Sequence, residues 1–259
     1  MSARDDHRRG FTLVELLIVI GIIGLLIAIL LPVLGAVRRA GRATACLANL
    51  QDWGRSYQMY LNANGGKSFL SPKDLTGQAW FELLQPYNGD VSRTLLCQDA
   101  TEPGNMIGSS SLAWGPTRTY VIAAPQWQVR GTFVGSYGFN AWLWRTPPGQ
   151  AMPPEFAGRM IDLPAAHSDS VPVLADCIAE QGMPLETDTA PSNLEHPLPV
   201  SGSGVPGPRG QMAYFCIDRH GRAVNVLFLD GHAARVPLGE LWKLQWHRGF
   251  EKHEVTGLP

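Results

Sequence analysis

A carboxylate stands inside a long apolar run near the start of the chain. Glu15 is the only charged residue between Phe11 and Val37, and most residues around it are aliphatic. A carboxylate inside a membrane-spanning helix costs about 2.5–3.5 kcal/mol and usually has a partner or a function. The chemistry available here is the pairing of this acid with a cation, because two opposite buried charges cost far less together than apart.

A second group of residues could act through imidazole and carboxylate side chains. His220, Asp230 and His232 lie close in the sequence, and Asp–His pairs can orient a general base or bind a metal. Seven residues of strand between two turns would span about 23 Å, which places His220 and Asp230 at opposite ends of a hairpin. We therefore expect turn roles: Asp230 caps a left-handed turn at Gly231, and His220 hydrogen-bonds the preceding turn.

The apolar run that contains Glu15 predicts a membrane-spanning helix over residues 11–35. About 20 apolar residues, rising 1.5 Å each, cross a hydrocarbon core of roughly 30 Å. Pro32 should kink or loosen the helix near its outer end. A secretory signal peptide has a shorter apolar region ending at a small-x-small site. Ala43-Thr44-Ala45 offers such a site, but the run is too long; a plain signal anchor is the other alternative.

The helix is expected to continue over residues 36–66, beyond the membrane. Apolar or small residues recur at alternating steps of four and three, which predicts one face of an amphipathic helix. The chain then reaches Asn64-Gly65-Gly66, a suitable helix end. The residues of this face are Ala36, Ala40, Ala43, Leu47, Leu50, Gly54, Tyr57 and Leu61.

The sequence Gly10-Phe11-Thr12-Leu13-Val14-Glu15 resembles the type III signal of type IV prepilins and type II secretion pseudopilins. In that family a membrane peptidase cuts after the Gly and methylates the new N-terminal Phe. The resemblance implies that residues 1–10 are a cleaved leader, that Phe11 becomes N-methylated, and that Glu15 faces the Phe11 ammonium of a neighbouring subunit. It also places Pro32 where many pilin helices unwind in filaments.

The same resemblance implies partners and a location. Prepilin peptidase, other pilin-like subunits and the inner membrane are the expected partners. The arginines on the two sides of the span balance, so the positive-inside rule does not decide the orientation. The family implies a cytoplasmic N-terminus before processing and a periplasmic or extracellular head.

Residues 67–259 are expected to form a β-rich head, so the fold class is α+β with a pilin-like antiparallel sheet. The chain has 259 residues, a net charge of −1, 28 Gly and 20 Pro. A net charge this close to zero gives no indication of nucleic-acid binding. The Gly and Pro content favours loops and strands. Strands are expected at 93–97, 118–123, 132–144, 171–177, 212–217, 223–229 and 232–236, short helices at 76–87 and 237–250, and a long loop at 186–210.

A second resemblance lies in the last three of these strands. His220, nine residues and then Asp230-Gly231 match the H-x(9)-D-G pattern of the prepilin-type processing-associated family, most of whose members are known as predicted surface or secretion proteins. Gln98 departs from the Pro common in that family. Some secretion pseudopilins hold Ca²⁺ in a C-terminal loop, and Asp176, Asp218 and Asp230 would supply the oxygen ligands. Without that ion we expect no cofactor.

Four cysteines are spread along the chain without a C-x-x-C pair, so zinc-finger spacing is absent. An exported head permits disulfides. We expect the pairs Cys46–Cys97 and Cys177–Cys216, and four buried free thiols are the alternative.

The sequence therefore predicts a structural subunit without enzymatic activity. It would be processed by prepilin peptidase and assembled through its N-terminal helix into a type II secretion or type IV pilus-like filament. Two alternatives remain open. One is an anchored carbohydrate-binding protein that uses exposed Trp side chains, and the other is a metal-dependent hydrolase that uses His220 and Asp230.

Overall fold

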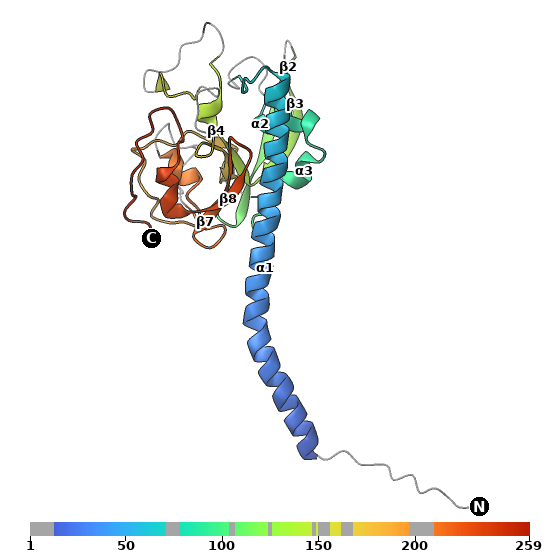
Figure 1. Ribbon diagram of the computed structural model, residues 1–259. Helices are drawn as coiled ribbons and strands as arrows, with labels where there is room; N and C mark the ends of the chain where they lie inside the picture. Colours follow the sequence, from blue (N-terminus) through green and yellow to red (C-terminus); the bar gives the residue numbers. More distant parts are fainter. Residues whose placement is uncertain are drawn as a thin grey trace, which may run out of the picture. The chain divides into compact units, whose positions relative to one another are not determined.

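A computed structural model of the chain describes residues 13–70, 78–103, 107–123, 126–146, 149, 156–161, 168–196 and 210–259. The chain forms two compact units, residues 1–41 and 42–259. The longest element, α1 (Leu13–Ala63), has 51 residues and confirms the expected long helix (Figure 1). Its residues 13–41 belong to the first unit, and the remainder packs within the second.

The first unit exposes a continuous apolar surface. Among the described residues, the exposed large hydrophobic side chains all lie between Leu13 and Val37, with the exception of Met59. By length and composition α1 is able to cross a membrane. Pro32 lies inside the helix. A segment this apolar on every side is typical of a helix surrounded by lipid or by other apolar helices.

The second unit contains a five-stranded sheet in the order β6-β4-β5-β7-β8. The pairs are antiparallel except β4 with β6, which is parallel. A second sheet has the order β1-β2-β3. The strands are β1 (Glu102–Pro103), β2 (Leu112–Ala123), β3 (Gln126–Gly135), β4 (Tyr137–Asn140), β5 (Pro172–Asp176), β6 (Gln181–Gly182), β7 (Ala223–Phe228) and β8 (Ala233–Pro237). A long N-terminal helix followed by mainly antiparallel sheets confirms the expected α+β class.

Alternation along β7 directs its side chains into two buried clusters. Leu227 joins a cluster that includes Leu50, Trp53 and Tyr57 of α1. Its neighbours on the opposite face, Val224, Val226 and Phe228, pack with the 3-10 helices η5 (Gln211–Tyr214) and η6 (Leu238–Lys243). Successive strand side chains point to opposite faces, so β7 lies between α1 and the C-terminal segment.

Several expected elements differ in the structure. Residues 93–97 are not a strand: α3 (Val91–Thr94) forms there, because the Asp90 side chain accepts the backbone N–H of Arg93 as an N-cap. Residues 212–217 are not a strand either: the 3-10 helix η5 covers the first three of them and the rest follow it. The expected three-stranded meander is therefore the two-stranded β7–β8 hairpin. Short apolar runs cannot separate a strand from a buried helical turn by periodicity alone.

The remaining differences concern boundaries. The strand expected over 132–144 is divided into β3, β4 and the 3-10 helix η2 (Ala141–Leu143), with the break at Ser136. The terminal helix is reduced to η6. The first short helix is α2 (Trp80–Leu84), continued by the 3-10 turn η1 (Gln85–Tyr87). Its expected cap, Thr76, lies outside the described residues.

Candidate functional site

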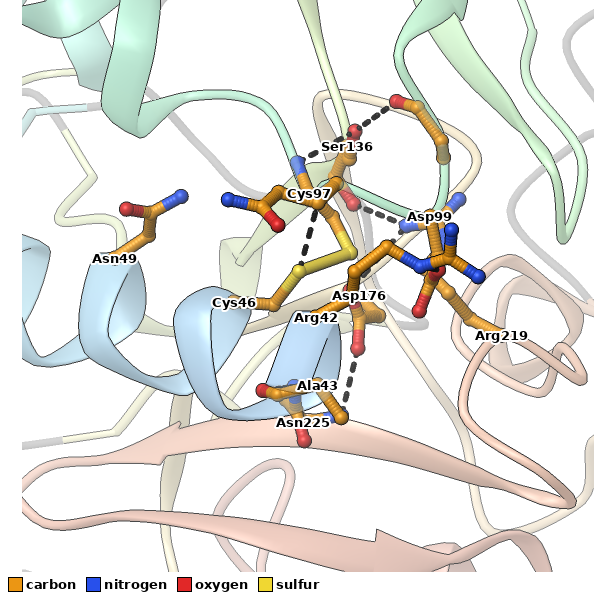
Figure 2. The surroundings of a disulfide bond; sticks show 12 residues. Arg42, Ala43, Cys46, Asn49, Cys97, Asp99, Ser136, Asp176, Arg219 and Asn225 are labelled. Atoms are coloured by element: carbon orange, nitrogen blue, oxygen red, sulfur yellow. Dashed lines mark hydrogen bonds and ion pairs between the residues drawn. A yellow bond between two sulfur atoms is a disulfide. The ribbon is translucent and has the colours of Figure 1, made fainter. Parts of the chain in front are cut away.

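The Cys46–Cys97 disulfide joins α1 to the segment that follows α3 (Figure 2). Both cysteines are fully buried, and their Cα atoms are 5.1 Å apart. The backbone N–H of Gln98 lies 3.1 Å from Cys46 Sγ, and the Tyr137 hydroxyl donates to the Cys46 carbonyl at 3.2 Å. The helix is thus tied covalently to the body at its first buried turn.

The second expected pairing is wrong. Cys177 and Cys216 are free and buried, and both lie in the cluster on the side of the sheet away from α1. Burial raises the pKa of each thiol to about 12, with small opposing contributions from neighbouring N–H groups or arginines. Such thiols are protonated at neutral pH and act as small hydrophobic side chains.

Beside the disulfide, an ion pair between Arg219 and Asp176 is completely buried. Arg219 Nη1 lies 3.4 Å from Asp176 Oδ1, and both side chains have no exposed surface. The other carboxylate oxygen accepts the backbone N–H of Asn225 at 2.7 Å. Burial acts to raise the pKa of Asp176, but the hydrogen bond and charge of His220, with the charge of Arg219, hold it below its ordinary value.

Arg219 also fixes two segments of backbone. Its guanidinium donates to the carbonyls of Ser109, Ser110 and Ser136 at 2.7, 3.0 and 2.5 Å. Five donors in a rigid planar fork allow one arginine to satisfy several carbonyls at once. The residue therefore holds together the start of β4 and the turn that precedes β2.

His220 lies between two carboxylates and the disulfide. Its Nε2 is 3.2 Å from Asp176 Oδ2 and 3.5 Å from Cys97 Sγ. Its Nδ1 is 3.1 Å from Asp99 Oδ2, although the direction does not suit a hydrogen bond. Asp99 in turn pairs with Arg42 of α1 at 2.6 Å. The expectation that His220 serves its preceding turn is wrong, because its side chain points into this cluster.

A family model described as the prokaryotic N-terminal methylation motif matches residues 5–31. The chain carries the type IV prepilin and pseudopilin signature. No curated protein and no solved structure matched.

In this pilin-like chain the signature residues fall partly outside the described region. Gly10 and Phe11 precede the first described residue. Glu15 lies in the first turn of α1, within the exposed apolar segment. The part of the signature that the structure describes is therefore helical and accessible.

The H-x(9)-D-G segment contacts the buried half of α1 at two points. Near its middle, the Asn225 side chain donates to the Ala43 carbonyl at 3.2 Å (Figure 2). Near its Asp230-Gly231 end, Gln58 Nε2 donates to the Leu229 carbonyl at 2.7 Å. The Asp230-Gly231 turn forms as expected: Gly231 has φ of 93°, and Asp230 accepts the backbone N–H of His232. In the pilin-like chain His220 and Asp230 lie on either side of β7, the strand on which α1 packs.

The three acidic residues considered for calcium have separate partners. Asp176 is engaged by Arg219 and Asn225, Asp218 accepts the backbone N–H of Arg222, and Asp230 pairs with His232 at 2.6 Å. Within the described part of the chain, the group close enough to share an ion contains none of them. No sequence motif marks Asp99, Arg219 or Asn225. The one available signal is that Asp99 lies two residues from Cys97 and that Arg219 adjoins His220.

The tryptophans of the pilin-like chain lie in its core. Trp53, Trp80, Trp114, Trp142, Trp144, Trp242 and Trp246 are all buried, and the side chain of Trp127 lies outside the description. The expectation of exposed tryptophans for carbohydrate binding is therefore wrong for these seven. Most of their indole N–H groups donate to carbonyl oxygens, for example Trp53 to Thr94 at 2.9 Å, which is usual for buried tryptophan.

Proposed function

We propose that this protein is a structural pilin-like or pseudopilin subunit that assembles through its N-terminal helix. Prepilin peptidase would cut between Gly10 and Phe11 and methylate Phe11. Glu15 would then pair with the Phe11 ammonium of a neighbouring subunit. The filament would be of the type II secretion or type IV pilus-like kind.

The observation that carries this proposal is the prepilin signature on a helix whose apolar side chains are exposed. Each large aliphatic side chain left in water forgoes about 1.5–3 kcal/mol, so this segment needs lipid or other apolar helices around it. A single acid in such a segment is stabilised by an opposite charge from a neighbour. An N-terminal amine is available on every processed subunit.

The disulfide supports a location for the head. Disulfides form and persist in the periplasm and outside the cell, and they are rare in the cytosol. The buried Cys46–Cys97 bond therefore favours a head on the outer side of the inner membrane. This location agrees with a leader that starts in the cytoplasm.

We propose a role without catalysis. A hydrolase built on His220 and Asp230 would need the two side chains in one site. His220 instead contacts Asp99 and Asp176, whereas Asp230 contacts His232 at the hairpin tip. With β7 between them, the separation supports a structural role for each.

Mass spectrometry of the native N-terminus tests the proposal. The protein would be isolated from membranes of its own host and digested, and its first peptide identified. We expect a peptide that begins with N-methylated Phe11. A peptide that retains residues 1–10 would contradict the proposal. A mature chain that begins beyond residue 41, without the apolar segment, would also contradict it.

A further inference from the structure

Three potential metal-ligand atoms lie close together in the core, beside the buried Arg219–Asp176 ion pair. The Sγ atoms of Cys46 and Cys97 and one ring nitrogen of His220 lie within 4.8 Å of one another, and all three residues are buried. In the described part of the chain this is the one group of three or more Cys, His or acidic side chains with such spacing. Two sulfurs and an imidazole are donors that zinc prefers.

We propose that reduction of the Cys46–Cys97 disulfide turns this point into a zinc site. A dithiol reductant would supply two electrons and two protons, open the S–S bond and leave as its own disulfide. Zinc would then displace both thiol protons into solvent, because the thiolate is the metal ligand. The disulfide form and the zinc form exclude each other.

The distances around His220 suit a tetrahedral ion. Zn–N and Zn–S bonds of about 2.0 and 2.3 Å place a nitrogen and a sulfur ligand about 3.6 Å apart. His220 Nε2 lies 3.5 Å from Cys97 Sγ. Asp176 lies outside the group of three, but its Oδ2 is 3.2 Å from the same nitrogen, where a tetrahedral N–O edge is about 3.4 Å. A shift of this carboxylate toward the two sulfurs would supply the fourth ligand.

The surroundings of the ligands suit a metal as well. A ligating histidine almost always donates its other ring N–H to a carboxylate, a carbonyl or a water. Asp99 Oδ2 is 3.1 Å from His220 Nδ1, which makes no well-directed hydrogen bond in the disulfide form. A small rotation of the imidazole toward zinc would give Nδ1 that partner.

The local charges also balance in the zinc form. Two thiolates and the Asp176 carboxylate would carry three negative charges, against two positive charges on zinc. Arg219, 3.4 Å from Asp176 and without exposed surface, supplies the third positive charge. A buried metal site without such compensation would be strongly disfavoured.

Zinc at this site would also affect folding of the head. A newly made chain with both thiols reduced could hold α1 against the body through zinc before oxidation takes place. Zinc would then delay formation of the disulfide, because its ligands are the same two sulfurs.

Zinc loading of the full-length chain in detergent tests this inference. The protein would be reduced with dithiothreitol, freed of reductant by anaerobic gel filtration, incubated with zinc chloride and desalted. Mass spectrometric metal analysis should find about one zinc per reduced chain and almost none on the air-oxidised chain. Replacing zinc by Co²⁺ should give the absorption of tetrahedral cobalt with thiolate charge transfer.

Variants locate the site. His220→Ala and Asp99→Asn should weaken zinc binding at least about tenfold. His232→Ala and the Cys177→Ala/Cys216→Ala double variant are the matched controls and should bind as the wild type does. The inference is overturned by a reduced wild type that holds no zinc, by zinc that requires Cys177 or Cys216, or by cobalt spectra of octahedral oxygen ligation. The cobalt spectrum uses the wild type, so it decides even where a variant fails to fold.

Discussion

Gly54 of α1 lies directly over Leu227 of β7. A Cβ atom built on Gly54 would come 2.7 Å from Leu227 Cδ1 and 3.5 Å from the Gly231 carbonyl oxygen. The helix therefore approaches the sheet closely at a residue without a side chain. The same contact sets the H-x(9)-D-G turn against the helix.

We predict that Gly54→Ala destabilises the head. The added methyl group has to displace the Leu227 side chain, and overpacking of this kind costs about 1–3 kcal/mol. Gly41→Ala is the matched control, because nothing lies within 4 Å of a Cβ there, and a helical Gly→Ala change gains up to about 1 kcal/mol. Urea unfolding followed by tryptophan fluorescence would measure both. Equal effects of the two substitutions would argue against the close packing.

Loss of the disulfide should strongly destabilise the folded head. The cysteines are 51 residues apart, and the chain-entropy relation for a loop of that length gives about 4 kcal/mol. The Cys46→Ala/Cys97→Ala variant should unfold at correspondingly lower urea, and reductant should not lower its midpoint further. A Cys177→Ala/Cys216→Ala variant should remain sensitive to reductant. Insensitivity of that variant would show that another bond carries the effect.

The buried Asp176 carboxylate should control acid stability. Asp176→Asn leaves Arg219 buried without its counter-charge, which costs about 3–5 kcal/mol at pH 7. The folded pKa of Asp176 is lowered, so its stabilisation is complete above its ordinary pKa of 3.8. That stabilisation is lost as the pH falls through the lower pKa of the folded protein.

Thermal unfolding between pH 2 and 7 measures this effect. The wild type should lose stability below about pH 4, and the Asp176→Asn variant should lose less over the same interval. Glu240→Gln, which removes an exposed carboxylate, is the control and should follow the wild type. A variant curve parallel to that of the wild type would place the acid transition elsewhere.

Replacement by glutamine should shift the unfolding temperature in opposite directions at Glu180 and at Glu186. Burial, followed by the charge of Glu82, raises the pKa of Glu180. For Glu186, burial acts in the same direction, but hydrogen bonds from Arg159 and His247 prevail and lower its pKa. At pH 7, Glu180→Gln should therefore raise the unfolding temperature, and Glu186→Gln should reduce it.

The sign for each glutamate follows from linkage. A carboxyl with a raised folded pKa favours folding at low pH and loses that contribution as the pH rises through its folded pKa. A carboxyl with a lowered folded pKa behaves in the reverse manner. The benefit of Glu180→Gln should accordingly disappear near pH 4. A benefit that persists there would point to packing and not to charge.

Assembly should depend on the charge of Glu15. Glu15→Gln keeps the size of the side chain and removes the proposed partner of the neighbouring amine, so we expect normal membrane insertion and loss of co-assembly. Cross-linking of tagged variant and wild-type chains would measure assembly. Gly10→Val should remain unprocessed and also fail to assemble. Comparison of the two variants therefore distinguishes a defect in leader cleavage from a defect in subunit pairing. Co-assembly of Glu15→Gln at the wild-type level would contradict the proposed pairing.

The sequence was informative wherever a pattern is local. The apolar run around Glu15 and the amphipathic face through Leu50 and Tyr57 predicted α1, because helical periodicity depends on neighbouring residues alone. The Asp230-Gly231 turn was predictable for the same reason, since glycine adopts a positive φ without steric cost. The short segments at 93–97 and 212–217 were not, because periodicity in a short apolar run does not distinguish a strand from a buried helical turn.

What the sequence determined by itself is the prepilin signature, the long helix and the β-rich class of the head. The tertiary structure alone decided where His220 lies and what surrounds it. Its neighbours Cys97, Asp99 and Asp176 come from segments 44 to 123 residues away in the chain. Such contacts depend on how the sheet and α1 pack, and no spacing along the chain encodes them. The same packing separates His220 from Asp230, joins Cys46 to Cys97, and leaves Cys177 and Cys216 as buried thiols.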